Sequence, residues 1–223
     1  MAMKCAPNAK AVVFDAYGTL FDVNSAVMRH AGAIGPQASA FAALWRQKQL
    51  EYSWVLSLAR RFADFWTLTQ QSLDYAFASF PHVDRGLRPA LLAAYRRLDP
   101  YPEVPQVLGR LRQAGLVTAI LSNGDPAMLA DAIASAGIGQ VLTQVFSVSA
   151  VATFKTDPRA YAQVLAPLKV NTSEMAFISS NRWDVAGATA YGFPSIWVNR
   201  AGAPDEYADL SPILVIRSLA ELN

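Results

Sequence analysis

Cysteine and histidine are scarce in this sequence. Its 223 residues include one cysteine, Cys5, and two histidines, His30 and His82. A single cysteine cannot form an intramolecular disulfide, and we expect no thiolate metal cluster. Neither histidine has a partner motif, so we expect surface or packing roles for both and no Ser–His nucleophile.

A strong charge of one sign and long apolar runs are also missing. The net charge is only +2, from 19 Lys and Arg against 17 Asp and Glu, without a basic run. Nucleic acid is therefore not an expected partner. No apolar run approaches the roughly 18 residues that span a bilayer, and the first ten residues do not resemble a signal peptide. We expect a cytoplasmic globular protein without a membrane partner.

Short apolar runs recur along the chain. The first is AVVF at residues 11–14, and the others lie at 117–121, 141–148, 175–178 and 195–198, with a sixth candidate at 213–216. Runs of this length are typical of parallel strands that are buried on both faces. Helical patterns at 102–114, after Asp125-Pro126, at 158–165 and at 184–191 alternate with them. This alternation predicts an α/β fold with a Rossmann-like open parallel sheet.

Residues 23–98 show a different pattern, without a convincing strand. Apolar residues recur there at three- and four-residue spacing, as from Phe41 to Val55, which predicts helices. We therefore expect a core domain of residues 1–22 and 99–223, and a helical cap subdomain of residues 23–98. An insertion after the first strand lies beside the strand ends where open α/β sheets bind ligands. The plainer interpretation is a helical packing unit.

Polar side chains follow four of the apolar runs. Asp15 follows the first run, Ser122 the second, Lys155 comes a few residues after the third, and Ser179 follows the fourth. Because parallel strands end at one edge of their sheet, these groups should converge there.

Taken singly, several of these polar residues have plainer interpretations. Asp125 and Asp184 are both typical of helix N-caps, and Thr19 could satisfy a backbone group in a turn. Asp15 is nevertheless the best nucleophile candidate, because a desolvated carboxylate attacks well when it is held in line with a leaving group. Lys155 would keep it ionised and oriented.

Five separated segments resemble the L-2-haloacid dehalogenase family (type II) of the haloacid dehalogenase (HAD) superfamily. They read DAYGTLFD at 15–22, LWRQKQLEY at 44–52, LSNG at 121–124, SSNRWD at 179–184 and WVNR at 197–200. The resemblance covers essentially the whole chain. It implies a HAD-like core with a cap, and hydrolysis of short-chain L-2-haloalkanoic acids to D-2-hydroxyalkanoic acids. It also implies a homodimer and no metal or other cofactor.

The same resemblance implies residue roles. Asp15 would attack C2 of the substrate with inversion and form an aspartyl ester, which water then hydrolyses. Arg46 would receive the halide, assisted by Asn123, while Ser122 and the amides around Tyr17 would hold the substrate carboxylate. The remaining catalytic group would be Thr19, Ser179, Asn181 and Asp184, supported by Lys155 and Tyr161. The lining around the alkyl part would be Tyr17, Gln47, Leu50, Phe65 and Trp183.

Tyr17 separates this interpretation from the main alternative, a magnesium-dependent phosphatase of the same superfamily. In those phosphatases the residue two after the nucleophile is a second Asp that serves as acid and base. Tyrosine is a poor general base at neutral pH, whereas a departing halide needs no proton. A catalytically dead binding module is a third interpretation. One departure from the family is Thr156, which replaces the usual proline after Lys155.

Overall fold

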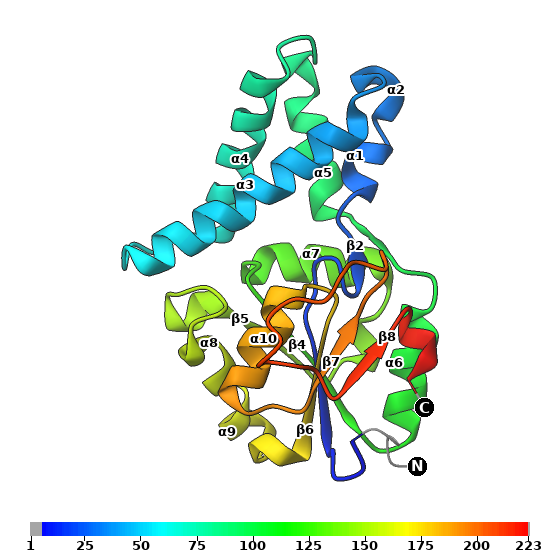
Figure 1. Cartoon of the computed structure of the whole chain (residues 1–223). Coiled ribbons are helices and arrows are strands. Elements are labelled where there is room, and N and C mark those ends of the chain that lie inside the picture. The colour runs from blue at the N-terminus through cyan, green and yellow to red at the C-terminus, as the bar shows by residue number, and fades with distance from the viewer. Residues whose placement is uncertain (1–5, 223) are drawn as a thin grey trace.

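The computed structural model describes residues 6–222, so Cys5 lies outside the described residues. Its core is a six-stranded sheet whose neighbouring strands are all parallel, in the order β5-β4-β1-β6-β7-β8. The predicted parallel α/β class is therefore confirmed. Figure 1 shows helices packed around this sheet and a separate helical layer above its upper edge.

The strands form where the apolar runs predict them, with small shifts at their ends. The strands are β1 (Ala11–Phe14), β4 (Val117–Ser122), β5 (Gln144–Ser147), β6 (Met175–Ser179), β7 (Ser195–Val198) and β8 (Leu214–Ile216). The third prediction, 141–148, is too long, because 3-10 turns at Gly139–Val141 and Val148–Val151 flank β5. β5 is also an edge strand, which explains why Val145 is exposed.

The chain order of the strands places β1 at the centre of the sheet. From β1 the chain moves to β4 and β5 on one side, then crosses back to β6, β7 and β8 on the other. A reversal of this kind opens a crevice beyond the carboxyl ends of the central strands. Phe14 pairs with Ile120 of β4 and Ile178 of β6. Asp15, the next residue, therefore enters that crevice.

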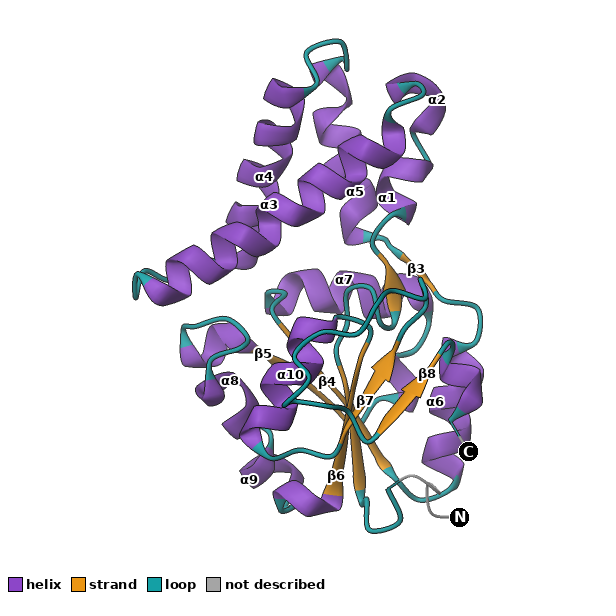
Figure 2. Cartoon of the chain, viewed as in Figure 1, coloured by secondary structure: helices purple, strands orange, loops and turns teal. Residues whose placement is uncertain are grey.

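Helices cover both faces of the sheet. They are α6 (Val104–Gln113), α7 (Pro126–Ala136), α8 (Pro158–Ala162), α9 (Leu165–Leu168) and α10 (Arg182–Tyr191). Figure 2 shows α6 on one side of the strands and α8, α9 and α10 on the other. This is the arrangement that right-handed crossovers produce when the strand order reverses.

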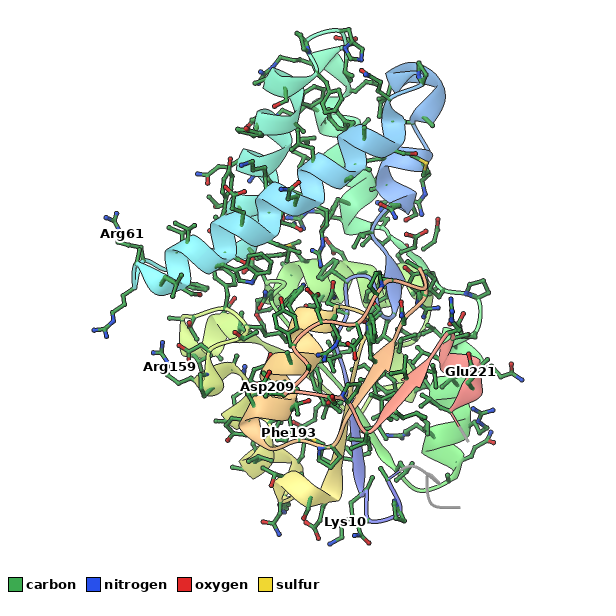
Figure 3. The ribbon with its side chains drawn as sticks, in the orientation of Figure 1. Lys10, Arg61, Arg159, Phe193, Asp209 and Glu221 are labelled. Atoms are coloured by element: carbon green, nitrogen blue, oxygen red, sulfur yellow. The ribbon has the colours of Figure 1, made fainter. Side chains whose placement is uncertain are left out.

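The segment between Asp22 and Asp99 carries the additional helices. They are α1 (Ser25–Met28), α2 (Ala31–Ile34), α3 (Ala38–Leu58), α4 (Phe65–Ser79) and α5 (Arg88–Arg96). A two-stranded antiparallel ribbon, β2 (Phe21–Asp22) with β3 (Asp99–Pro100), joins this segment to the rest. The helices lie above the carboxyl ends of the strands, whereas Lys10, before β1, lies at the opposite pole (Figure 3).

Asp125 does not act as the simple N-cap that its position predicts. It precedes α7, but its side chain makes no capping bond there. Its carboxylate instead accepts hydrogen bonds from the backbone N–H of Phe65 (3.1 Å) and Trp66 (2.6 Å), the first residues of α4, and from the Ser149 hydroxyl (3.0 Å). A residue of the sheet domain thus satisfies two of the N–H groups that open a helix in the layer above.

No helix among residues 6–222 is long and apolar enough to cross a membrane.

Replacement of Asp125 by alanine should loosen α4 from the sheet domain. Loss of the charged acceptor is expected to lower the free energy of unfolding by about 2 kcal/mol. It should also speed hydrogen exchange of the Phe65 and Trp66 amides, as NMR or mass spectrometry would measure. Asp64→Ala is the matched control, because Asp64 accepts from Thr67 N within the same helix. Unchanged exchange at Phe65 and Trp66 in Asp125→Ala would contradict this role.

Candidate active site

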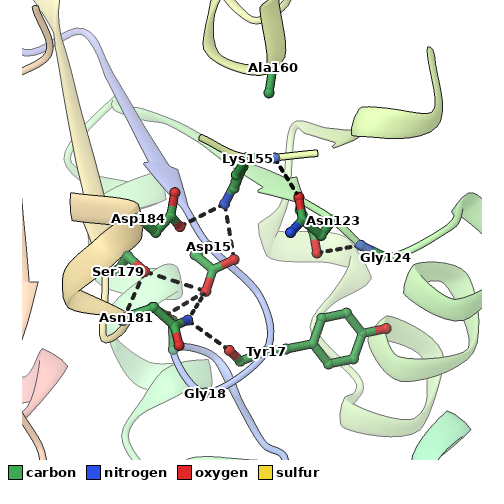
Figure 4. A network of polar contacts seen from close by, with 12 residues as sticks. Asp15, Tyr17, Gly18, Asn123, Gly124, Lys155, Ala160, Ser179, Asn181 and Asp184 are labelled. Atoms are coloured by element: carbon green, nitrogen blue, oxygen red, sulfur yellow. Dashed lines mark hydrogen bonds and ion pairs between the residues drawn. The ribbon is translucent and has the colours of Figure 1, made fainter. Parts of the chain in front are cut away.

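Asp15 is buried at the carboxyl end of β1, and its two carboxylate oxygens have different surroundings. Oδ2 accepts hydrogen bonds from Asn181 Nδ2 (2.8 Å), Thr19 Oγ1 (3.1 Å) and, at longer range, Ser179 Oγ (3.4 Å). Oδ1 accepts one, from Lys155 Nζ at 3.0 Å. One oxygen is thus fixed by three donors, and the other is less encumbered (Figure 4).

Lys155 lies between two carboxylates. Its ammonium also donates to Asp184 Oδ2 at 2.8 Å, and its side chain is fully buried. Burial acts to lower the pKa of Lys155, but Asp15 and Asp184 outweigh that effect and raise the pKa above its usual value. The ammonium therefore stays charged. The peptide bond between Lys155 and Thr156 is cis.

Asp184 lies in the first turn of α10, inside the helix, so it is not the N-cap; Asn181 occupies that position. Its Oδ1 accepts from the Tyr161 hydroxyl at 2.8 Å. Burial raises the pKa of Asp184 to about 6, against the opposite effect of Lys155. Burial also raises the pKa of Tyr161 well above its usual value, so this phenol remains a donor.

Gly187 provides the space for this contact. A Cβ atom at this position would lie 2.4 Å from the Tyr161 hydroxyl and 2.7 Å from Thr156 Cγ2. A side chain there would therefore push the phenol away from Asp184. Thr156, which departs from the family pattern, thus packs directly against α10, and Lys155 still reaches both carboxylates.

Tyr17 forms part of an aromatic wall. Its ring stacks on Tyr95 at a centroid distance of 5.8 Å and lies 6.3 Å from Phe65. A Cβ atom on Gly124 would come within 2.6 Å of the Tyr17 ring, so glycine is needed there. The Tyr17 hydroxyl is buried and has no hydrogen-bond partner within residues 6–222.

Ser122, the last residue of β4, and Asn123, the next residue, carry polar side chains at this end of the sheet. Asn123 Oδ1 accepts from the backbone N–H of Lys155 at 3.0 Å, while Asn123 Nδ2 is buried without a partner in the described chain. Ser122 Oγ accepts from Gly124 N at 3.0 Å. Figure 4 shows Asn123 on the opposite side of Asp15 from Asn181. A buried amide donor that nothing satisfies is a natural anion contact.

The Arg46 side chain extends from α3 toward the loop after β1. Its Nη2 donates to the Tyr17 carbonyl at 3.4 Å, which links the helical layer to the loop after β1. Within residues 6–222 its guanidinium forms no ion pair. A positive charge without a counter-ion is thus held beside the β1 loop.

The predicted lining residues differ in how they are placed. Phe65 is buried against Tyr17. Trp183 is half-buried and packs edge-on against Trp54 of α3, with ring centroids 5.5 Å apart. Leu50 is half-buried, but Gln47 is exposed and makes no hydrogen bond within the described part of the chain.

Several residues at the site were missed by the sequence reasoning. Gln49 and Tyr95 contact Arg46 and Tyr17, and Gly124 and Gly187 provide clearance. Gln49 follows Arg46 by three residues, and that helical spacing could have indicated it. Tyr95 lies 49 residues after Arg46, and no pattern in the neighbouring sequence indicates a role for it.

The donor set does not fit a magnesium ion. Asp15 and Asp184 are the carboxylates that would have to share a metal, and the Lys155 ammonium already lies 3.0 Å and 2.8 Å from them. The superfamily's phosphatases have a second Asp two residues after the first. This chain has Tyr17 there, and its neutral phenol faces aromatic rings. Hard cations prefer several oxygen ligands and no neighbouring cation.

A buried carboxylate at a strand end, held by several donors beside a lysine, fits a hydrolase, and the comparisons agree on that class. Residues 9–192 match the model of haloacid dehalogenase-like hydrolases, and the chain belongs to that family. Within it, the chain belongs with the (S)-2-haloacid dehalogenases. It is 47 % identical to (S)-2-haloacid dehalogenase 1 of Pseudomonas sp. (strain CBS-3), over 96 % of this chain and 94 % of that protein.

Solved structures agree with this placement. The crystal structure of a dehalogenase with an intermediate complex matches with a TM-score of 0.94 and 42 % identity, over 96 % of each chain. An L-2-haloacid dehalogenase from Xanthobacter autotrophicus, with chloropropionic acid covalently bound, matches with a TM-score of 0.87 and 38 % identity, again over 96 % of each chain. The family predicted from the sequence segments is confirmed.

The raised pKa of Asp184 predicts a particular dependence of stability on pH. A carboxyl that titrates at about 6 when folded and near 4 when unfolded binds its proton more tightly in the folded state. Its contribution to the free energy of unfolding is therefore full below pH 4 and is lost as the pH rises to about 6. The loss should be about 3 kcal/mol.

Urea unfolding of the wild type and of Asp184→Asn between pH 4 and 7 measures this effect. The stability of the wild type relative to the variant should fall over that range and level off above pH 6. A difference that stays constant or rises with pH would contradict the assignment.

Proposed function

We propose that this enzyme hydrolyses the carbon–halogen bond of short-chain (S)-2-haloalkanoic acids to give 2-hydroxy acids of inverted configuration. The observation that carries the proposal is the asymmetric setting of Asp15, whose Oδ2 has three donors while Oδ1 faces only Lys155. Dehalogenation by close relatives supports it, since a solved relative holds covalently bound chloropropionic acid. The dehalogenase activity follows from this site and this family.

The first step is displacement at C2. Oδ1 of Asp15 forms a bond to C2 as the carbon–halogen bond breaks, and the halide leaves with the bonding electrons. Backside attack inverts the carbon and leaves an ester on Asp15. Arg46 and the unpartnered Nδ2 of Asn123 are placed to receive the halide. Because a halide leaves without a proton, no acid is needed where Tyr17 stands.

The second step is hydrolysis of that ester. Water adds to the carboxyl carbon of Asp15, and negative charge develops on Oδ2. The donors Thr19, Ser179 and Asn181 already point at that atom and act there as an oxyanion hole. Asp184, whose pKa is about 6, accepts the proton of the water at neutral pH. Cleavage of the bond between that carbon and Oδ1 releases the hydroxy acid as its alkoxide oxygen takes the proton from Asp184, and the second proton of the water passes to solvent as the Asp15 carboxylate re-forms.

Substrate binding combines a polar and an apolar part. Ser122 and the amides around Tyr17 hold the carboxylate, and the aromatic wall of Tyr17 and Phe65 packs against the alkyl part. Leu50, Trp183 and Gln47 complete the lining. Close packing of these rings over the nucleophile favours short chains.

The other interpretations have less support. A magnesium-dependent phosphatase would need a carboxylate at position 17 and space for a cation beside Asp15, and Tyr17 and Lys155 occupy those places. A binding module without activity would not need Asp15, Lys155 and Asp184 joined in one buried cluster.

A direct assay tests the function. In the presence of a metal chelator, the enzyme should release chloride from (S)-2-chloropropionate and not from the (R) enantiomer, and the product should be the (R)-hydroxy acid. Asp15→Asn should lose this activity, with mass spectrometry used to exclude deamidation back to aspartate. Absence of halide release, together with magnesium-dependent phosphate release from a phosphoester, would overturn the proposal.

We also propose a domain organisation, an oligomeric state and a cellular location. Residues 23–98 serve as a cap on a core of residues 1–22 and 99–223, joined by the β2–β3 ribbon. The enzyme is a homodimer in the cytoplasm. Exposed Trp54, Val55 and Leu58 near the projecting end of α3, which Arg61 marks in Figure 3, support a contact between copies. Sedimentation velocity of the purified protein measures its mass and would exclude the dimer if only monomer appears.

A further inference from the structure

Arg46 lies on α3, a helix of the proposed cap, and its direct contact with the loop after β1 is weak. The contact between Nη2 and the Tyr17 carbonyl is long, at 3.4 Å. The strong contact is on the other side of the guanidinium, where Nη1 donates to Gln49 Oε1 at 2.7 Å. The direction in which the guanidinium points is therefore set by Gln49.

The Gln49 side chain is fully buried, and both its amide oxygen and its amide nitrogen make hydrogen bonds. Oε1 accepts from Arg46 and from the Tyr95 hydroxyl (3.0 Å), and Nε2 donates to Thr69 Oγ1 at 2.6 Å. Thr69 in turn donates its hydroxyl proton to the Phe65 carbonyl at 2.7 Å. The amide oxygen of Gln49 thus faces two donors, and its amide nitrogen faces an acceptor.

This chain of bonds fixes the orientation of the Gln49 amide. The Thr69 hydroxyl proton is committed to Phe65, so its oxygen can only accept, and the group facing it must be the NH₂ of Gln49. The carbonyl oxygen must then face Arg46. Tyr95 supplies the second donor, and since burial raises its pKa, it stays protonated. Tyr95 also stacks on Tyr17, which ties the network to the aromatic wall.

We infer that Gln49 is a positioning residue that aims the Arg46 guanidinium at the departing halide and does so without neutralising it. A carboxylate in the same place would hold the arginine equally well but would cancel its charge. A neutral amide keeps the full positive charge for an anion. The inference rests on the proposed function, in which Arg46 receives the halide.

Leaving-group dependence distinguishes this role from a structural one. Chloride leaves less readily than bromide, so displacement of chloride depends more on stabilisation of the developing charge. Gln49→Met should lower kcat/KM for (S)-2-chloropropionate by about 10- to 100-fold, the equivalent of one hydrogen bond to a charged group. The loss with (S)-2-bromopropionate should be smaller. Inhibition by added chloride should also weaken.

Three further variants sharpen the test. Gln49→Glu should keep Arg46 in place, with the Thr69 hydroxyl turned from the Phe65 carbonyl to donate to the new carboxylate, yet lose chloride inhibition. Tyr95→Phe removes one donor to Gln49 and should shift the chloride-to-bromide ratio in the same direction by less. The matched control is Gln71→Met, on the exposed side of α4, which should leave both substrates unaffected.

A double-mutant cycle tests whether Gln49 acts through Arg46. In an Arg46→Met background, adding Gln49→Met should cost less than about twofold, because the group that Gln49 positions is already gone. Full additivity, or an equal loss with both halides in Gln49→Met and in Tyr95→Phe, would overturn the inference. Wild-type enzyme that releases no halide from either substrate would instead overturn the proposed function itself.

Discussion

The Lys155 ammonium, placed between the buried carboxylates of Asp15 and Asp184, is the contact on which the site depends. Two carboxylates this close would repel each other strongly in a buried setting, and the lysine offsets that repulsion. The ring of Phe177 lies 5.0 Å below the ammonium, so apolar packing closes its remaining side. Removing the lysine would leave buried charges without compensation.

The two carboxylate oxygens of Asp15 have different partners, and the proposed chemistry depends on that difference. Lys155 occupies Oδ1, and three neutral donors from the β1 turn and from β6 and its following loop occupy Oδ2. In the proposed mechanism the same neutral donors orient the nucleophile in the first step and stabilise the oxyanion in the second. The Lys155 ammonium also occupies the place between the two carboxylates that a metal ion would need.

The sheet domain and the helical layer supply different parts of this site. The strand ends bring the nucleophile and its donors, because the reversal of strand order brings these residues to one crevice. The helices bring the charge of Arg46 and the packing of Phe65. Asp125 and Gln49 are what keep those two parts in place, one by holding the start of α4 and the other by aiming the guanidinium.

Much of this arrangement could be predicted from the sequence, for identifiable reasons. The buried strands are short apolar runs, so β1 and β7 were located to the residue. Asp15, Lys155 and Asp184 were found because strand ends in a parallel sheet converge. Asp125 occupies the predicted N-cap position of α7, but the sequence could not show the partners of its side chain, because those N–H groups lie 59 and 60 residues away.

Contacts between the helices of the upper layer, and the space that each glycine leaves for a neighbouring ring, could not be predicted from the sequence for a related reason. The pairing of Tyr95 with Gln49 depends on how α5 packs on α3, which no spacing along the chain reveals. The need for glycine at 124 and 187 depends on where the rings of Tyr17 and Tyr161 come to rest.

In the proposed mechanism Asp15 becomes an ester and is regenerated by attack of water on its own carboxyl carbon. A single turnover in H₂¹⁸O, with enzyme in excess over (S)-2-chloropropionate, tests it most directly. Mass spectrometry of the peptide that contains Asp15 should show one ¹⁸O in its carboxylate, and the hydroxy acid should carry none. Label in the product and none in Asp15 would mean that water attacks the substrate itself, and would contradict the account.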